Sequence, residues 1–333
     1  MSDLTDFLVE SADTGAAKLV NLQMSNWTVR DAQTGGWYCL AYNGTLFAAA
    51  RYNGTTTRVM TSPDGITWTY RNAAADNTWN GMAWNGSVFA AVSSTGTGNR
   101  VMTSPDGITW TSRTSASDDG WYAIAWNGTV FAAVSYGSVM TSPDGTTWTT
   151  RTSAGSYNWR NIAWNGTVFC STAMGGGKAM TSPDGITWTL RTMPNSNEYR
   201  GIAWNGTVFA SCAMTGTADR VSTSPDGITW TSRTTPSTAD NGWWDIAWSG
   251  SVFCAVAYSG NQQIMTSPDG ITWTARTSTK IGAAWSPGYL RIAWNALGTS
   301  SMPMTPAEGD GSHFVLVGDS VGKAATSLFL KDE

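Results

Sequence analysis

The sequence predicts an all-β fold, a closed ring of seven four-stranded antiparallel blades, and two repeated motifs support this prediction. The first motif, Trp-Thr-x-Arg, begins at Trp27, Trp68, Trp110, Trp148, Trp188, Trp230 and Trp273. The second, Ala-aromatic-Asn-Gly or a near copy, begins at Ala41, Ala83, Ala125, Ala163, Ala203, Ala247 and Ala293. A repeat of about 40 residues that contains several short strands is typical of a β-propeller blade.

The two motifs are offset at the ends of the chain, and the offset predicts how the ring closes. The first Trp-Thr-x-Arg has no unit before it, and the last Ala-Trp has no Trp-Thr-x-Arg after it. A ring explains this arrangement, because residues 26–30 can supply the missing fourth strand of the last blade. Such an exchange removes the sheet edges that would otherwise invite aggregation.

Residues 121–151 illustrate one unit. Branched and aromatic residues predict strands. Asn-Gly and Ser-Pro-Asp-Gly predict tight hairpin turns, because both residues of Asn-Gly tolerate a positive φ and the ring of Pro fixes its φ at a value that suits a turn. The predicted strands are 121–126, 129–134, 138–141 and 146–151. The last unit departs from this pattern with a long insertion up to about residue 312, before strands at 314–317 and 324–327.

Composition narrows the classes of partner. Charged residues make up 13% of the chain and the net charge is −4, so we expect no nucleic-acid partner, which would require clustered Lys and Arg. No apolar run approaches the roughly 20 residues that span a bilayer, so we expect no membrane insertion. The N-terminus lacks the features of a signal peptide, which predicts synthesis in a cytoplasm without general secretion.

Cysteine and histidine usage predicts neither a metal site nor a cofactor. The four cysteines, Cys39, Cys170, Cys212 and Cys254, form no CxxC pair, and His313 is the single histidine. A zinc site or a histidine-based catalytic triad is therefore not expected. We interpret the cysteines as small buried apolar residues.

A third motif carries a family resemblance. Ser-Pro-Asp-Gly-x-Thr-Trp begins at Ser62, Ser104, Ser142, Ser182, Ser224 and Ser267. It resembles the Asp-box of sialidase-type propellers, although it is one residue shorter between Asp and Trp. With the N-terminal segment 4–8, the repeats also resemble bacteriophage tail and virion proteins. The resemblance implies a propeller and a place in the virion, and it is weak for activity because propellers of this kind have many functions.

The repeated polar residues are interpreted as structural. An Asp in each of six hairpins is expected to bond the turn's own backbone, and the seven equivalent arginines do not form the carboxylate-binding triad of sialidases. The Tyr/Glu nucleophile pair of that family has no identifiable match either. We therefore predict that the protein is not an enzyme, with a sialidase-like glycosidase as the least favoured alternative, because paired carboxylates at hydrolytic separation are not evident.

Aromatic residues stand at the start of each predicted inner strand, on the face that also carries the variable loops, here called the top face. Two readings remain. The rings wedge between blades, or they form a collar that stacks on sugar rings. On the second reading, the ligand-binding candidates are Trp37, Trp79, Trp121, Trp159, Tyr199, Trp243, Trp244, Trp285 and Tyr289. Trp244 and Trp285 fit no repeat position, which favours a ligand role for them.

The predicted organisation is an N-terminal arm, residues 1–23, followed by a propeller, residues 24–333. Leu4, Phe7, Leu8 and Val9 could form one apolar helical turn that orders on docking. The functional prediction is a phage tail or virion adhesin whose top face binds a host-surface glycan. The arm and the bottom of the last blade would attach it to other virion proteins. The main alternative is a purely structural virion subunit that binds protein only.

Overall fold

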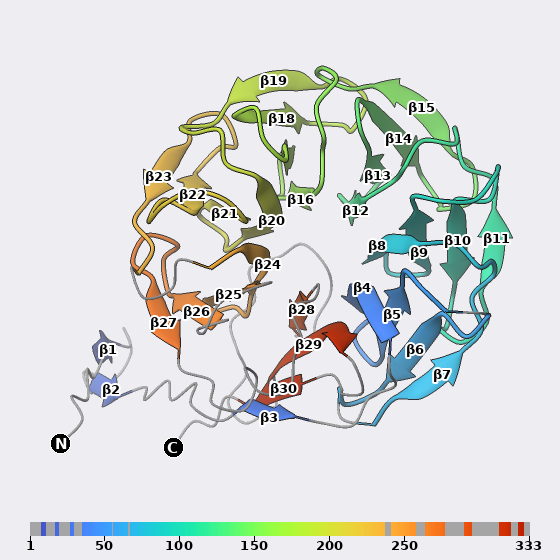
Figure 1. Cartoon of the computed structure of the whole chain (residues 1–333), viewed down its shortest axis with the longest axis horizontal. Coiled ribbons are helices and arrows are strands. Elements are labelled where there is room, and N and C mark those ends of the chain that lie inside the picture. Colours follow the sequence, from blue (N-terminus) through green and yellow to red (C-terminus); the bar gives the residue numbers. More distant parts are fainter. Residues whose placement is uncertain are drawn as a thin grey trace.

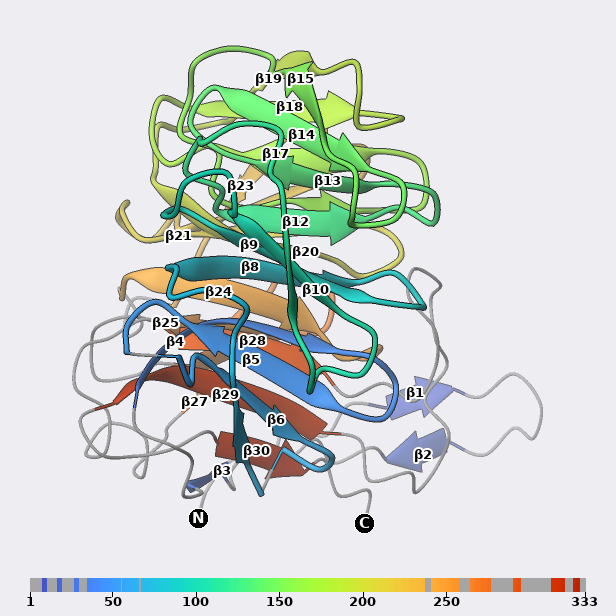
Figure 2. The same ribbon diagram turned by 90° about the vertical axis from the view of Figure 1, so that its right-hand side faces the viewer.

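The computed structural model describes residues 8–10, 17–19, 27–29, 35–54, 56–65, 67–236, 241–257, 264–276, 290–294, 313–320 and 326–329. These residues form strands and connecting turns, and no helix long and apolar enough to cross a membrane occurs among them. The antiparallel sheets stand around a common axis as the blades of a β-propeller (Figure 1). Seen from the side, the strands run from one face of the ring to the other (Figure 2). The prediction of an all-β propeller is confirmed.

Five blades are separate four-stranded antiparallel sheets, each built from consecutive strands. They are described here from the axis outward. One contains β8 (Trp79–Trp84), β9 (Phe89–Ser93), β10 (Val101–Ser104) and β11 (Thr111–Arg113). The next contains β12 (Ala123–Trp126), β13 (Phe131–Val134), β14 (Ser138–Ser142) and β15 (Thr149–Thr152). Then come β16 (Ala163–Trp164), β17 (Phe169–Thr172), β18 (Lys178–Ser182) and β19 (Thr189–Thr192). The fourth has β20 (Tyr199–Trp204), β21 (Phe209–Ala213), β22 (Val221–Ser224) and β23 (Thr231–Arg233). The fifth has β24 (Trp243–Trp248), β25 (Phe253–Ala257), β26 (Ile264–Ser267) and β27 (Thr274–Arg276).

The remaining strands of the ring form one eight-stranded sheet, so the ring has six sheets where the sequence predicted seven separate blades. One half consists of β4 (Gly35–Tyr42), β5 (Phe47–Arg51), β6 (Val59–Ser62) and β7 (Thr69–Arg71). The other half consists of β28 (Leu290–Trp294), β29 (His313–Ser320), β30 (Thr326–Phe329) and β3 (Trp27–Val29). The halves merge because the end of β29 pairs with the start of β4, with Asp319 opposite Gly36.

The N-terminal strand β3 pairs with β30 near the C-terminus, with Trp27 opposite Leu328 and Val29 opposite Thr326. This is the pairing that the offset of the repeats predicted. Farther toward the N-terminus, β1 (Leu8–Glu10) and β2 (Ala17–Leu19) form a separate antiparallel pair outside the ring (Figure 1). The predicted helical turn is therefore wrong for Leu8 and Val9, which are in a strand, while Leu4 and Phe7 lie outside the described residues. A lone apolar turn of this length has too few hydrogen bonds to be stable.

The hairpins explain why the same short motifs recur. In the Asn-Gly turn, the Asn127 side-chain oxygen accepts the amides of Thr129 and Val130 at 2.9 and 2.7 Å, while Gly128 adopts a φ of 98°. In the Ser-Pro-Asp-Gly turn, Asp144 accepts the amides of Thr146 and Thr147 at 2.8 and 3.1 Å. These bonds satisfy the turn backbone locally, which confirms the structural interpretation of the repeated aspartates in the described hairpins.

The core lies between neighbouring sheets. The separate sheets present bulky side chains toward one neighbour and smaller ones toward the other. Trp121, Phe131 and Met140 of the β12–β15 sheet, for example, pack on Ala90 and Val92 of the preceding sheet. Every residue of the second strand of each separate sheet is buried, because neighbours cover both of its faces. All four cysteines are buried and free, as predicted.

The repeated arginines support the outer strands. The Nε–H of Arg151 donates to the Thr141 hydroxyl at 2.9 Å across the β14–β15 pair. The same bond recurs for Arg71, Arg113, Arg191, Arg233 and Arg276. Their prediction as structural residues is confirmed.

Candidate functional site

The predicted aromatic collar is packed inside the ring. Trp79, Trp121, Trp159, Tyr199 and Trp243 have 0% exposure and Trp37 has 2%. The indole N–H groups of Trp79, Trp121 and Trp159 each donate to a carbonyl four residues earlier, at 3.3 Å. The faces of these rings contact protein and present no surface on which a sugar could stack. These six residues, here called the wedge aromatics, therefore pack between blades, as the first of the two interpretations predicted. Trp285 and Tyr289 lie outside the described residues.

Trp244 differs from the other aromatic candidates. It is also buried, with 6% exposure, but it follows the wedge residue Trp243 in the chain. The guanidinium carbon of Arg200 lies over the Trp244 ring, 4.4 Å from its centroid. Trp244 therefore supports a charged group from a neighbouring blade and does not itself face solvent.

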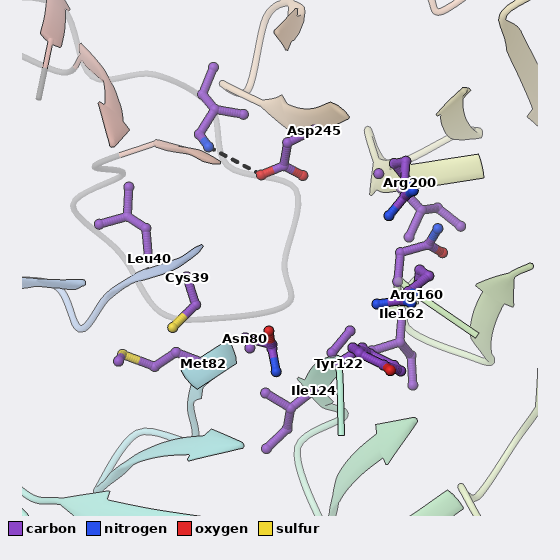
Figure 3. Close-up of a pocket in the computed structure, with 16 residues that line it drawn as sticks. Cys39, Leu40, Asn80, Met82, Tyr122, Ile124, Arg160, Ile162, Arg200 and Asp245 are labelled. Carbon is purple, nitrogen blue, oxygen red and sulfur yellow. Dashed lines mark hydrogen bonds between the residues drawn. The ribbon is translucent and has the colours of Figure 1, made fainter. Parts of the chain in front are cut away.

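A cavity of about 150 Å³ lies at the centre of the ring and is a candidate site among the described residues (Figure 3). Residues of all the innermost strands, or just before them, line it. They include Cys39, Leu40, Asn80, Met82, Tyr122, Ile124, Arg160, Asn161, Ile162, Arg200, Ile202, Asp245 and Ile292. Figure 3 shows Arg160, Arg200, Asn80 and Asp245 around one space, together with the aliphatic side chains of Leu40, Ile124 and Ile162.

The backbone of the inner strands explains how polar residues reach this cavity. In four sheets the residue after the wedge aromatic interrupts the strand register, between Trp37 and Cys39, Trp79 and Gly81, Tyr199 and Gly201, and Trp243 and Asp245. A β-bulge re-aims a side chain without ending the strand. The wedge aromatic therefore enters the core between sheets. The next one or two residues, which are Asn80, Arg200 and Asp245 in three of these sheets, line the cavity.

Two arginines on neighbouring blades form the positive part of the wall. The guanidinium carbon of Arg160 lies 3.5 Å from the centroid of the Tyr122 ring, one blade earlier. Arg200 rests on Trp244, one blade later. Stacking on an aromatic face fixes the orientation of a guanidinium. Together these four residues form an arc, here called the arginine arc, around one side of the cavity.

Acidic and amide groups complete the polar wall. Asp245 lines the cavity and accepts the backbone N–H of Ile292 at 3.1 Å, across to the next inner strand. Glu198, outside the lining, forms an ion pair with Arg200 at 3.6 Å. The Asn80 amide donates to the carbonyls of Thr78 and Trp121, both at 3.1 Å. The wall therefore carries cationic donors, anionic acceptors and a positioned amide.

An aliphatic belt lies deeper in the cavity. Ile202 follows Arg200 by two residues in β20, which corresponds to about 6–7 Å along the strand, and Ile162 follows Arg160 by two residues in the segment that leads into β16. Leu40, Met82, Ile124 and Ile292 occupy the matching positions. The cavity is polar toward the top face and apolar below, which suits a ligand with a charged end and a compact apolar surface.

The repeats did not predict the arginine arc, although one position of the inner strand carries a signal for it. Within the repeated inner strand, the position after the first aromatic residue varies from unit to unit, with Tyr38, Asn80, Tyr122, Arg160, Arg200, Trp244 and Leu290. Variation at one position of a regular scaffold is how specific sites are usually built. Trp244 occupies this variable position, together with Arg160 and Arg200.

The described residues contain no cluster of three or more His, Cys, Asp or Glu that could hold a metal ion. Among the described residues that line the cavity, Asp245 is the acidic one, and it accepts the backbone N–H of Ile292. The arrangement as described can bind polar or anionic groups.

Comparisons with known proteins identify the fold. A scan of protein families finds no match, and neither does a search of curated proteins. Among solved structures, a streptogramin B lyase matches with a TM-score of 0.73 and 11% identity, over 92% of this chain and 99% of that chain. The virginiamycin B lyase of Staphylococcus aureus matches with a TM-score of 0.72 and 11% identity, over 91% and 98%. YCF48 bound to D1 peptide matches with a TM-score of 0.66 and 14% identity, over 92% and 97%. At such identities the shared property is the β-propeller, a fold that includes enzymes and peptide-binding proteins.

Proposed function

We propose that the protein is a non-enzymatic adhesin of a phage tail or virion, with a seven-bladed propeller that binds a host-surface glycan at its central cavity. The observation that carries the binding role is the arginine arc. Two arginines, each stacked on an aromatic ring, face a cavity that also contains carboxylate and amide groups. Fixed polar groups above an apolar belt are typical of small-ligand sites.

The blade count rests on the repeats and on the strand order. The eight-stranded sheet contains two successive sets of four antiparallel strands, and each set has the same strand order as a separate blade. With the five separate sheets, these sets correspond to the seven sequence units. The Ser-Pro-Asp-Gly hairpins support the likeness to Asp-box propellers, because the Ser142 hydroxyl donates to Asp144 and the Trp148 indole donates to Gly145.

The virion assignment rests on the resemblance of the repeats and the N-terminus to phage proteins. The β1–β2 pair lies outside the ring and is the segment that we propose contacts other virion proteins. Deleting residues 1–20 should abolish incorporation into particles while leaving the ring folded. Normal incorporation of the deleted chain would show that the arm has no attachment role.

The binding function is tested on an array of bacterial surface polysaccharides with the full chain. Trp244→Ala removes the surface beneath Arg200 and should weaken any glycan signal at least tenfold, because Arg200 loses its stacking partner. Tyr136→Ala is the matched control, since Tyr136 is 63% exposed and does not line the cavity. Equal losses in both variants would argue against the cavity as the binding site. Analysis of bound glycans for cleavage products tests the non-enzymatic assignment in the same experiment.

A purely structural virion subunit is the second candidate, favoured by one observation. Ile108, Ile186, Ile228 and Ile271 are each 45–47% exposed at equivalent positions of the Ser-Pro-Asp-Gly hairpins. Exposed aliphatic side chains repeated around a ring suit contact with protein. A folded chain that binds no polysaccharide on the array, and whose incorporation into particles fails when these isoleucines are replaced by Ser, would favour this candidate.

A further inference from the structure

We propose that the exposed isoleucines of the Ser-Pro-Asp-Gly-Ile hairpins form a docking surface for a basic protein partner that carries apolar side chains among its lysines or arginines. The inference goes beyond the proposed glycan-binding function, because it concerns the face of the ring opposite the top face, here called the bottom face. The described residues of this surface, here called the isoleucine rim, are Ile108, Ile186, Ile228 and Ile271.

The isoleucine rim differs from the rest of the described surface in its exposure. Among the described residues, six large apolar side chains are exposed, and Tyr136 is the one at the top face. Four of the others are the rim isoleucines, and the fifth is Leu190, which lies in β19 and is 40% exposed. The rim hairpins connect the third and fourth strands of their blades, which lie at the periphery of the ring (Figure 1). Exposed apolar side chains therefore gather at the outer edge of one face.

The turn itself does not require isoleucine at this position. In the hairpin between β14 and β15 the position is occupied by Thr146, whose amide donates to Asp144 at 2.8 Å. The amide of Ile186 donates to Asp184 at the same distance. The Thr146 hydroxyl forms a further hydrogen bond to its carboxylate, so threonine serves the turn at least as well as isoleucine. Turn chemistry therefore does not explain the exposed isoleucines, whereas contact with a partner does.

Each rim isoleucine is held in the same geometry. The backbone amides of Ile108, Ile186 and Ile228 donate to the aspartate two residues earlier at 2.8 Å. The amide of Ile271 does so at 2.7 Å. A β-branched side chain on a fixed backbone has few rotamers. The rim is therefore preorganised, and contact with it loses little conformational entropy.

A negative charge accompanies each rim isoleucine. The amide of Thr109 lowers the pKa of Asp106. Partial burial would raise the pKa of Asp184, Asp226 and Asp269, but the hydrogen bonds of each turn outweigh this effect and lower the pKa. All four carboxylates are therefore ionised at neutral pH.

The hairpins of the bottom face contain no basic residue beside these carboxylates. Neither the Ser-Pro-Asp-Gly-x-Thr-Trp segments nor the Asn-Gly turns include Lys or Arg. Arg58, Arg100 and Arg220 lie at the opposite ends of their blades, just before the third strands. A surface that combines exposed isoleucines with carboxylates complements a partner that combines apolar side chains with basic ones.

Three of the rim isoleucines are on consecutive blades. Ile186, Ile228 and Ile271 belong to the blades of β16–β19, β20–β23 and β24–β27, whereas the blade with Thr146 separates Ile108 from them. A partner that contacts several hairpins at once gains affinity from each of them, even where a single contact is weak. The docking surface is therefore centred on Ile228.

The test uses the full chain and three synthetic peptides of equal length. One is an amphipathic Lys/Leu peptide, the second has Ser in place of Leu, and the third has Glu in place of Lys. Fluorescence anisotropy should show that the Lys/Leu peptide binds at least tenfold more tightly than either of the others. Its affinity should fall as the salt concentration rises, because salt screens the attraction between exposed charges. This comparison uses the unaltered protein and does not depend on the folding of any variant.

Two triple variants locate the effect. The first carries Ile186→Ser, Ile228→Ser and Ile271→Ser, and the second has Asn in place of the aspartate of each of these three hairpins. Each should weaken binding of the Lys/Leu peptide at least tenfold at low salt, because apolar burial or charge attraction is lost. The turns of the second variant should stay intact, since the side-chain oxygen of Asn127 accepts turn amides in the same way. Ile108→Ser alone should have less effect than Ile228→Ser alone.

Matched controls carry the same kinds of change on the top face. Asp76→Asn, Asp118→Asn and Asp219→Asn together remove as many negative charges. Tyr136→Ser removes an exposed apolar side chain. Both controls should bind the Lys/Leu peptide as the unaltered chain does.

Several outcomes would overturn the proposal. Equal binding of the three peptides, or losses in the controls as large as those in the rim variants, would remove the basis for a docking surface on the rim. Self-association of the chain that the triple Ser variant abolishes, measured by sedimentation velocity, would assign the rim to a second copy. Binding to zwitterionic lipid vesicles that the same variant loses would assign it to a membrane surface.

The test is independent of the glycan-binding function. The peptides are expected to contact the rim and not the central cavity, so Trp244→Ala should leave their binding unchanged. Loss of peptide binding in Trp244→Ala would place the peptide site at the cavity and overturn the rim assignment. A chain that binds no glycan but shows the expected peptide preference would overturn the adhesin function alone.

Discussion

Gly201→Ala is expected to destabilise the ring and to disturb the cavity wall. A Cβ atom at Gly201 would lie 2.9 Å from the Cα of Asp245 and 2.9 Å from the amide nitrogen of Ile246, on the next inner strand. Both are backbone atoms, so a side-chain rotation cannot relieve the contact and the two blades must move apart. Overpacking of this kind costs about 1–3 kcal/mol.

Urea unfolding monitored by tryptophan fluorescence measures the effect. With a denaturant slope of about 3 kcal/mol per M, the midpoint should fall by roughly 0.3–1 M. Gly81→Ala should behave in the same way, because its Cβ would lie 2.9 Å from the Cα of Ala123. Gly120→Ala is the control, since the nearest atom to its Cβ is the Tyr122 hydroxyl at 3.2 Å, the end of a side chain that can move.

Movement at Gly201 should also reach the site. Asp245 bonds the amide of Ile292 at 3.1 Å, so a shift of its backbone changes the contact between two inner strands. We expect weaker ligand binding in Gly201→Ala than in Gly120→Ala under conditions in which both are folded. An unchanged unfolding midpoint for Gly201→Ala and Gly81→Ala would refute the argument that the blades approach each other closely at these glycines.

Three further predictions concern the hairpins and the core. A hydrogen bond from the Thr109 amide lowers the pKa of Asp106, and one from the Thr146 hydroxyl lowers the pKa of Asp144. Both carboxylates therefore stabilise the folded state at pH values above the unfolded pKa near 3.8. Thermal unfolding across pH should show constant stability near neutral pH and a decline as the pH falls below about 4. Asp144→Ala should cost about 1–2 kcal/mol in chemical denaturation, because two turn amides lose their acceptor, and an unchanged midpoint would contradict this account. Burial raises the pKa of the Cys170 and Cys254 thiols far above the usual range. The native protein should therefore resist thiol alkylation, whereas the urea-unfolded protein should be alkylated at once. Fast labelling of the native protein would place these thiols at the surface.

Local chemistry made most of the fold predictable from the sequence. Asn127-Gly128 and Ser142 to Gly145 form tight turns because their own side chains and glycines satisfy the backbone, whatever surrounds them. The offset between the first and last motifs likewise predicted that β3 would join β30. Each of these features depends on a few adjacent residues or on a count of repeats, and both can be read without coordinates.

The site could not be read in this way, because it depends on contacts between residues of different blades. The sequence marked Trp79 and Trp121 as a possible collar, but the structure buries them, since the small residues of the preceding sheet leave room for a large ring. Arg160 and Arg200 are 40 residues apart in the chain, one repeat of the ring, and only the closed ring brings both to one cavity. The bulges at the inner strands decided which residue faces the core and which faces the axis.

What the sequence determined by itself is therefore the repeating unit, its turns and the closure of the ring, because these follow from local hydrogen bonding and from periodicity. The tertiary structure decided the merging of the first and last units into one sheet, the burial of the wedge aromatics and the assembly of the arginine arc. Each of these depends on how closely neighbouring sheets pack around the axis. That spacing is a collective property of side-chain volumes such as those of Gly201 and Ala90, which no single repeat encodes.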